Sequence, residues 1–148
     1  MDNQALYLDE QLCFRLYATS RAMTKAYQPM LQALGITYPQ YLVLMVLWEW
    51  WDDEEKDVSV KRLGERLYLD SGTLTPLLKR MEAADLVRRQ RDDVDERKVL
   101  LYLTEAGLAL RPKVLAWVSC EVETRSMDER LIQRLRDDLS SLLGELTK

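Results

Sequence analysis

The chain has 148 residues, of which 47% are hydrophobic and 31% are charged, and its formal net charge is −4. This length predicts a single domain over residues 1–148 with a sizeable hydrophobic core, and the composition excludes an intrinsically disordered chain. Histidine is absent and the chain has two cysteines. The commonest general base and the usual metal ligand are therefore missing, so the sequence predicts a non-enzyme with no cofactor and no metal ion.

The expected location follows from the hydropathy pattern. No apolar run approaches the roughly 20 residues that a membrane-spanning helix needs, and no secretory signal peptide opens the chain. We therefore expect a cytoplasmic protein with no membrane partner. In such a reducing compartment two cysteines do not make a disulfide framework, so each thiol needs its own explanation.

Two helices are expected in the first third of the chain. Apolar side chains recur with a helical period over about residues 9–33, which predicts one long helix that ends at Gly35. Pro39 opens a second helix that is apolar nearly all round and hence buried. It runs into three tryptophans and then into the acidic residues 52–55, which we expect to form a solvated loop.

The middle of the chain has the order helix, helix, strand, turn, strand. Ser59 can cap a short helix over about residues 60–68, and the helix that follows carries an apolar stripe at helical spacing. That stripe consists of Leu74, Leu77, Leu78 and Met81. Residues 86–90 and 99–103 are typical of two antiparallel strands, and the polar residues 91–98 form the turn between them.

This order of elements is that of a winged helix-turn-helix, which binds DNA. We therefore predict a mostly α fold with a small β-wing, and we expect Thr104 to cap a following helix that Gly107 and Pro112 weaken or kink. Residues 58–98 contain ten Lys/Arg and eight Asp/Glu, a local net charge of +2 that leaves −6 on the rest of the chain. Since phosphate contact depends on the field within about 8–10 Å, a mildly positive face on an acidic body can bind double-stranded DNA.

Candidate DNA-contacting residues lie on the second helix of this motif, facing away from its apolar stripe. The small polar side chains can enter a major groove, and the two cations can contact phosphates. These candidates are Ser71, Thr73, Thr75, Pro76, Lys79 and Arg80. Pro76 is tolerable if the helix starts late, and it offers apolar contact to a thymine methyl group. In the turn, Arg97 suits a narrow minor groove and Asp95 could hold it in place.

Both ends of the chain are expected to form helices whose apolar faces are broader than a DNA-binding head could cover. Self-association through residues 1–35 and 105–148 would bury these faces in a homodimer. It would also relate two winged regions, each over residues 36–104, by a two-fold axis, as an operator with an inverted repeat requires. The alternative is that both apolar faces pack within one monomer.

Cys13 and the tyrosines at positions 17, 27 and 38 suggest a redox switch. The ordinary explanation of such a cysteine is a small buried hydrophobic residue. Tyr17 lies one turn from Cys13 on the same helix face, so its hydroxyl could approach the sulfur. Tyr27 lies 14 residues from Cys13, about 21 Å along a straight helix, so it could reach only the Cys13 of an antiparallel partner chain.

The segment Asp95–Lys98, followed by Leu103 and Thr104, resembles the signature of MarR-type winged-helix regulators, and the likeness extends over essentially the whole chain. Four other segments resemble the OhrR subgroup, which senses organic hydroperoxides. They are Gln11–Phe14, Leu16–Ala18, Tyr38–Tyr41 and Leu69–Pro76. The resemblance implies a homodimeric repressor that leaves its operator when the N-terminal cysteine is oxidised. It also implies that residues matching Tyr27 and Tyr38 hydrogen-bond the partner's reactive sulfur.

The resemblance further implies a role for Cys120. A second cysteine in the helix after the wing is similar to the two-cysteine class, in which an intersubunit disulfide would join Cys13 to Cys120. Alternatively, Cys120 is inert and a low-molecular-weight thiol caps Cys13. Three other functions stay open: a thiol peroxidase, a MarR-type repressor that responds to a small aromatic ligand with Cys13 structural, and an architectural DNA protein.

Overall fold

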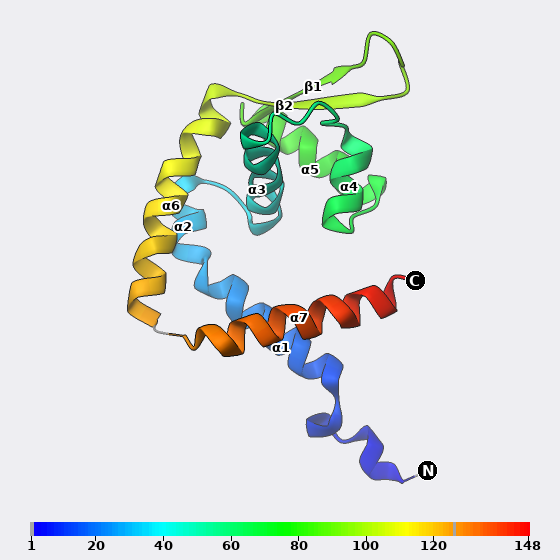
Figure 1. Ribbon diagram of the computed structural model, residues 1–148, viewed down its shortest axis with the longest axis vertical. Helices are drawn as coiled ribbons and strands as arrows, with labels where there is room; N and C mark the ends of the chain where they lie inside the picture. The colour runs from blue at the N-terminus through cyan, green and yellow to red at the C-terminus, as the bar shows by residue number, and fades with distance from the viewer. Residues whose placement is uncertain (1, 126) are drawn as a thin grey trace. The chain divides into compact units, whose positions relative to one another are not determined.

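The structure of the protein is a computed structural model that describes residues 2–125 and 127–148, and it describes side chains outside residues 122–126. The chain divides into two compact units, the first ending at Arg111 and the second beginning at Pro112. The described elements, labelled in Figure 1, are η1 (Asn3–Leu6), η2 (Leu8–Glu10), α1 (Leu12–Ala26), α2 (Gln28–Leu34), α3 (Tyr38–Asp52), α4 (Val60–Leu67), α5 (Ser71–Ala83), β1 (Val87–Arg91), β2 (Val99–Leu103), α6 (Glu105–Arg125) and α7 (Glu129–Leu146). The predicted mostly α fold with a small β-wing is confirmed.

The first unit begins with shorter helices than the sequence predicts. The prediction of one long helix over residues 9–33 is wrong, because the chain breaks at Tyr27 between α1 and α2. Pro29 has no N–H group, so the ladder of i to i−4 hydrogen bonds stops there. The amide of Tyr27 instead donates to Thr24 O at 3.1 Å, which is a tighter turn. Gly35 ends α2 as predicted, with a φ of 69° that favours glycine.

Helix α3 lies at the centre of the first unit's core. A capping box fixes its start: Thr37 Oγ1 accepts from the amide of Gln40 at 3.3 Å, and Gln40 Oε1 accepts from the amide of Thr37 at 3.0 Å. The helix is buried as predicted, and Trp48 Nε1 donates to Gly107 O at 3.1 Å, which links α3 to α6. Within the described residues no single helix is long and apolar enough to cross a membrane, although α2 and α3 pass that test together across a bend of 77°.

A helix-turn-helix follows, as predicted. Ser59 Oγ accepts from the amide of Arg62 at 3.2 Å and caps α4, whose Leu63 is fully buried. Tyr68 has a φ of 56°, and this left-handed residue turns the chain from α4 toward α5. The apolar stripe predicted for α5 is buried in the core, and it consists of Leu74, Leu77, Leu78 and Met81.

The wing is the antiparallel pair of β1 and β2. Strand β2 occupies the predicted residues, and β1 begins at Val87, one residue later than predicted. In the register of the pair, Val87 lies opposite Leu103. The amide of Leu101 donates to Val58 O at 2.9 Å, so the segment before α4 extends the sheet. The base of the wing is therefore attached to the helix-turn-helix.

Helix α6 begins at the predicted cap. Thr104 Oγ1 accepts from the amide of Gly107 at 3.0 Å and donates to Asp85 O at 2.5 Å. Gly107 has a packing role that the amino-acid sequence did not reveal. It is buried, and a Cβ at this position would collide with Leu86 O. The absence of a side chain lets α6 approach the residue before β1. The helix continues past Pro112 to Arg125.

The second unit consists of the remainder of α6 and of α7. Asp128 caps α7, because its carboxylate accepts from the amide of Arg130 at 2.9 Å. Leucines recur along one side of this helix, as predicted, and they are exposed in the single chain. Their exposed fractions run from 38% to 73% for Leu131, Leu135, Leu139, Leu143 and Leu146.

Candidate nucleic-acid interface and thiol sites

Helix α5 presents its polar side to solvent. Asp70 Oδ1 accepts from the amide of Thr73 at 2.7 Å, which satisfies one of the donors at the start of the helix. The exposed candidates are Ser71, Thr73, Pro76, Lys79 and Arg80, and Thr75 is half-buried. The buried leucine stripe on the opposite side of α5 fixes which side chains point outward.

Helix α5 does not start late, which was the condition under which Pro76 would be easily accommodated. Capped by Asp70, the helix begins at Ser71, so Pro76 lies inside it. Pro76 has no N–H group to donate to Gly72 O, four residues earlier. Gly72 is exposed, so water can satisfy that carbonyl, and this explains why the helix continues.

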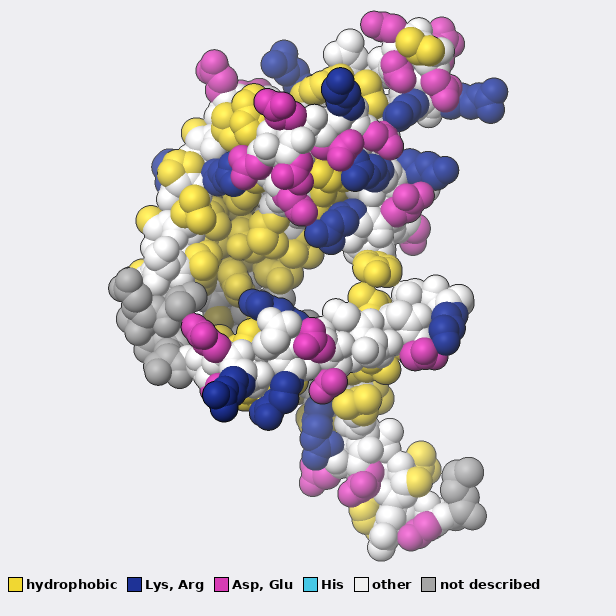
Figure 2. Space-filling model, in the orientation of Figure 1, with side chains coloured by type: hydrophobic (Ala, Val, Ile, Leu, Met, Phe, Trp, Pro, Cys, Tyr) yellow, Lys and Arg dark blue, Asp and Glu magenta, His cyan; other side chains and the backbone are white. Residues whose placement is uncertain are grey.

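The loop of the wing is closed by its own polar groups. Arg91 Nη1 donates to Glu96 O at 2.9 Å across the loop. Asp95 Oδ1 accepts from the amide of Arg97 at 3.1 Å, so Asp95 orders Arg97 through the backbone, whereas the sequence suggested contact with the guanidinium. The Arg97 side chain is exposed on this ordered turn, and Figure 2 shows acidic and basic side chains intermixed around the wing tip.

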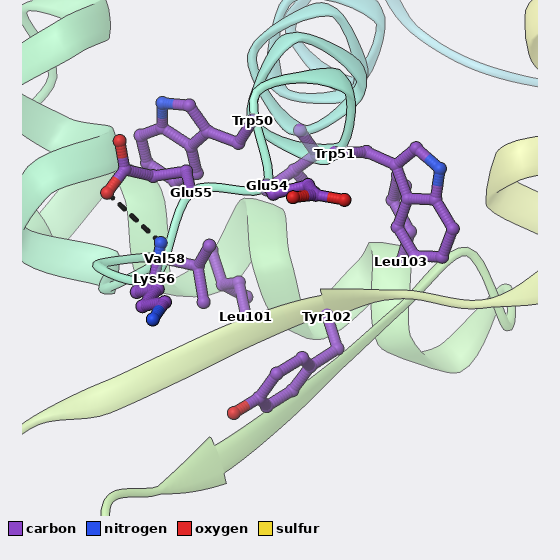
Figure 3. A pocket seen from close by; sticks show the side chains of 10 residues that line it. Trp50, Trp51, Glu54, Glu55, Lys56, Val58, Leu101, Tyr102 and Leu103 are labelled. Carbon is purple, nitrogen blue, oxygen red and sulfur yellow. Dashed lines mark hydrogen bonds between the residues drawn. The ribbon is translucent and has the colours of Figure 1, made fainter.

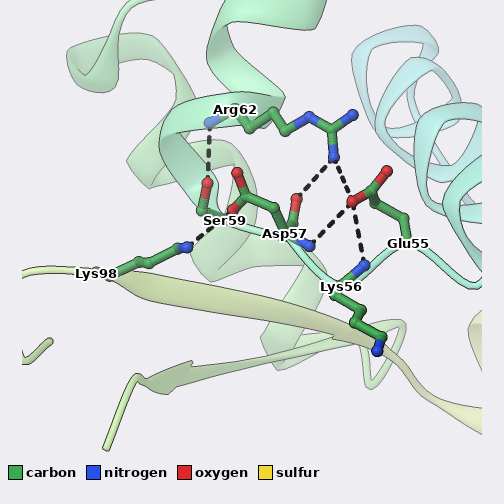
Figure 4. Close-up of polar contacts among 6 residues, drawn as sticks. All are labelled: Glu55, Lys56, Asp57, Ser59, Arg62 and Lys98. Atoms are coloured by element: carbon green, nitrogen blue, oxygen red, sulfur yellow. Dashed lines mark hydrogen bonds and ion pairs between the residues drawn. The ribbon is translucent and has the colours of Figure 1, made fainter. Parts of the chain in front are cut away.

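A network of charged groups holds the base of the wing (Figure 4). Lys98 Nζ lies 3.0 Å from Asp57 Oδ1, and the hydrogen bond lowers the pKa of Asp57 and raises the pKa of Lys98. Arg62 Nη1 lies 2.9 Å from Glu55 Oε1 and donates to Asp57 O at 3.1 Å. The amide of Asp57, followed by Arg62, lowers the pKa of the Glu55 carboxyl. Residue 55 is therefore part of an ion-pair network, not only of a solvated loop.

The remaining positive charge lies mainly on α5 and the wing. Four of the ten cations in residues 58–98 form ion pairs, and these are Arg62, Arg66, Arg89 and Lys98. The other six cations form no ion pair with any carboxylate among the side chains that the structure describes. They are Lys61, Lys79, Arg80, Arg88, Arg91 and Arg97. Unpaired surface cations are those that can exchange bound counterions for phosphates.

Cys13 is the second residue of α1 and is exposed in this chain. It is therefore not the buried hydrophobic residue that a cysteine most often is. The preceding Gln11 does not cap the helix with its side chain, because Gln11 Nε2 donates to Ala5 O at 2.6 Å. The sulfur is thus accessible to a peroxide from solvent.

Three tyrosines meet where α1, α2 and α3 adjoin. The ring centroids of Tyr27, Tyr38 and Tyr41 lie 5.7–6.0 Å from one another. Burial, followed by the neighbouring phenol of Tyr27, raises the pKa of Tyr38, and burial raises the pKa of Tyr41 to about 12. The Tyr38 and Tyr41 hydroxyls therefore stay protonated and can donate hydrogen bonds. Sequence reasoning missed Tyr41, although its place three residues after Tyr38 puts both on one helix face.

Within one chain this tyrosine cluster and Cys13 lie at opposite ends of α1. A rise of 1.5 Å per residue separates Cys13 from Tyr27 by about 21 Å. Tyr17 is one turn from Cys13, but it contacts Arg21, whose Cζ lies 5.4 Å from the ring centroid. The structure therefore brings Tyr27 and Tyr38 together and does not bring either to the Cys13 of the same chain. Cys120 lies on α6 in the second unit, and its side chain is exposed.

Comparison with known proteins places this geometry in a family. A family model described as transcriptional regulator SarA/Rot matches residues 25–111, more than half of the chain. The chain is 56% identical to the organic hydroperoxide resistance transcriptional regulator of Bacillus subtilis (strain 168) over 139 residues, covering 94% of this chain and 91% of that protein. The chain belongs to the SarA/Rot and MarR type of winged-helix transcriptional regulators. The resemblance of its motifs to OhrR-like regulators is confirmed.

Solved structures of AbfR, a protein of Staphylococcus epidermidis, resemble this MarR-type regulator. The structure of reduced AbfR bound to DNA has a TM-score of 0.79 and 33% identity, and the match covers 100% of both chains. The structure of disulfide-formed AbfR has a TM-score of 0.65 and 36% identity, and the match covers 92% of both chains. The named relatives are DNA-binding or transcriptional regulators.

Two arginines of the regulator's wing were not selected from the sequence. Arg88 is exposed on β1 opposite Tyr102, and Arg91 closes the loop through Glu96 O. The alternation of side chains along a strand could have indicated Arg88, because it places Arg88 and Gln90 on one face of the sheet. Both arginines add positive charge to the wing.

Proposed function

We propose that this MarR-type regulator is a homodimeric repressor that binds an inverted-repeat operator and releases it when an organic hydroperoxide oxidises Cys13. The winged head and the DNA-bound AbfR neighbour support operator binding. The observation that carries the redox function is an exposed thiol at one end of α1 with a tyrosine cluster at the other. The 56% identity to a regulator of organic hydroperoxide resistance supports this class of oxidant.

A second copy of the chain supplies what one copy lacks. Helix α1 exposes apolar and aromatic side chains, with exposed fractions of 37–63% for Leu12, Phe14, Tyr17 and Met23. An antiparallel α1 from the partner would cover them and bring the partner's tyrosine cluster to each Cys13. Residues 1–35 and 105–148 would then be the dimerisation region of a single-domain protein, and residues 36–104 its DNA-binding region.

The DNA contacts follow from the exposed side chains of α5 and the wing. The N-terminal part of α5 would enter the major groove, where hydroxyls and backbone amides donate to bases and phosphates. Arg97 would enter the neighbouring minor groove. The proposed contacts are Ser71, Thr73, Thr75, Pro76, Lys79, Arg80 and Arg97, with Asp95 positioning Arg97. A repressor acts in the compartment that contains its operator DNA, so we propose that this regulator has the expected cytoplasmic location.

The proposed chemistry balances with the hydroperoxide as the oxidant. The Cys13 sulfur attacks the terminal peroxide oxygen, and the O–O bond breaks to give an alcohol and a Cys13 sulfenic acid. The thiol of Cys120 from the partner then attacks that sulfur, and the products are a disulfide and water. Loss of the phenol contacts to the sulfur would let the dimerisation helices shift, so that the two α5 helices no longer match both half-sites.

A gel-shift experiment tests the proposal. Wild-type protein on DNA from upstream of its gene should release that DNA on treatment with cumene hydroperoxide and bind it again after a thiol reductant. Cys13→Ser should bind the DNA equally well and ignore the peroxide. Release of the DNA from Cys13→Ser by peroxide would exclude Cys13 as the trigger. Insensitivity of the wild type to oxidants, with release by small phenolic acids, would select the ligand-responsive repressor instead.

A further inference from the structure

A groove lies outside the DNA-binding and thiol sites, where the end of α3 passes over β2 (Figure 3). Its volume is about 630 Å³, and its apolar walls include Leu47, Val58, Leu101 and Leu103. Two adjacent tryptophans, Trp50 and Trp51, complete these walls. This size and this lining are those of a site for a small organic molecule.

One of the two tryptophans already binds a cation that the chain itself supplies. The guanidinium of Arg62 lies over the Trp50 ring, with Cζ 5.1 Å from the ring centroid. The same guanidinium lies 2.9 Å from Glu55 Oε1. An indole face and a carboxylate together hold this cation, the first through its π-electron quadrupole and the second through its charge.

Trp51 and Glu54 present the same two groups on the groove side without such a cation. The Trp51 side chain is 57% exposed, and no ion pair or cation–π contact involves Trp51 or Glu54 in the part of the chain with described side chains. Figure 3 shows the Glu54 carboxylate directed toward the Trp51 side of the groove. The Lys56 ammonium lies on the Glu55 side, away from Trp51. An indole and a carboxylate are thus left facing solvent beside an apolar floor.

We propose that this groove binds a small organic cation with an aromatic or alkyl body. Its charged nitrogen would lie between the Trp51 indole and the Glu54 carboxylate, and its apolar body would lie against the half-buried side chains of Val58 and Leu103. An organic anion in the same place would meet the Glu54 carboxylate, because the lysine that lines the groove, Lys56, lies on the Glu55 side. A small inorganic cation is strongly hydrated and gains nothing from the apolar walls. Because β2 is a strand of the wing, the ligand would contact the base of the wing.

Isothermal titration calorimetry of the full-length protein with benzyltrimethylammonium tests this proposal. Saturable binding is expected for this cation and not for phenylacetate or neutral benzyl alcohol. Trp51→Ala should raise the Kd by about two- to fivefold, since that is the worth of a cation–π contact at an exposed ring, and Glu54→Gln should raise it by a similar factor. Trp51→Phe, which keeps an aromatic face, should recover part of the affinity.

The matched control is Asp53→Asn, which removes an exposed carboxylate from the same acidic run but not from the groove lining. It should leave the Kd unchanged, and an unchanged circular dichroism spectrum of each variant should show that the fold is intact. Absence of saturable binding at millimolar concentrations would overturn the proposal. Equal binding of phenylacetate, or an unchanged Kd in both Trp51→Ala and Glu54→Gln, would also overturn it.

Discussion

Lys98 Nζ lies 3.0 Å from Asp57 Oδ1, and this ion pair joins the start of β2 to the segment that leads into α4. The two side chains are 37% and 50% exposed, so water screens the ion pair and it adds little to folding stability. Together with the bond from the Leu101 amide to Val58 O, it fixes where the wing lies relative to the helix-turn-helix. We therefore expect the pair to matter for DNA binding more than for folding.

Asp57→Asn is expected to weaken DNA binding several-fold, although it removes a negative charge. If Asp57 acted only through its charge, the substitution would strengthen binding to phosphates, so the sign of the change distinguishes the two roles. Lys98→Met should weaken binding as well, and the double variant should be no weaker than Lys98→Met alone. Fluorescence anisotropy at fixed salt measures this, and tighter binding by Asp57→Asn would contradict the positioning role.

Arg97→Ala should weaken DNA binding and lower the slope of log K against log salt by about one unit. The guanidinium is exposed on a turn that Asp95 holds through the Arg97 amide, so its removal should not disturb the fold. Arg130→Ala, on the exposed side of α7, is the matched loss of one arginine. Equal salt slopes for Arg97→Ala and wild type would exclude the contact with DNA.

Periodic patterns made much of the fold predictable from the sequence. The α5 stripe from Leu74 to Met81 and the strand β2 were located correctly, because one buried face repeats the same signal several times. The break at Tyr27 was missed, because it depends on the single N–H group that Pro29 lacks. Helix α5 also contains Pro76 without starting late, because the Asp70 side chain caps its first turn.

Part of the candidate site depends on packing between elements that lie apart in the sequence. Tyr41 joins Tyr27 and Tyr38 through the packing of α3 against the junction of α1 and α2, and no local pattern reports such packing. The same holds for the groove beside Trp51, because strand β2 supplies its floor from about fifty residues away. Contacts of this kind depend on tertiary structure, whereas periodicity reports only which face of an element is buried.

Gly107→Ala should destabilise the protein by about 1–3 kcal/mol or more, because the new methyl group would collide with the Leu86 carbonyl oxygen and press on Leu103. Urea denaturation at a fixed protein concentration measures the change. Gly144→Ala is the matched control on α7, where nothing lies within 4 Å of the added carbon. There the substitution should be neutral or stabilise the helix by up to about 1 kcal/mol. Equal effects at both positions would show that α6 does not pack tightly against Leu86.

Tyr41 should make the protein sensitive to alkaline pH. An unfolded tyrosine has a pKa of about 10, whereas burial raises the pKa of folded Tyr41 to about 12. The folded state holds the proton more tightly, so this contribution to stability is complete below about pH 10 and is lost as the pH rises toward about 12. Tyr41→Phe should lose less stability across that window in urea titrations. The control is Tyr7→Phe, because the Tyr7 side chain is 59% exposed. The stability of this variant should fall as steeply with rising pH as that of the wild type.

Cys120→Ser separates the second step of the proposed switch from the first. If Cys120 captures the oxidised Cys13 of the partner, peroxide-treated wild type should give a covalent dimer on a non-reducing gel, and Cys120→Ser should not. Ser119→Ala, one residue earlier on α6, is the control that leaves both thiols in place and should still form that dimer. Cys120→Ser should still release DNA at first, because the sulfenic acid alone breaks the phenol contacts. Prolonged treatment with peroxide should then oxidise Cys13 of this variant further, to the irreversible sulfinic acid. Recovery of DNA binding by a thiol reductant would then be lost in Cys120→Ser and kept in wild type. A covalent dimer that persists in Cys120→Ser would mean that another pair of sulfurs forms the bond.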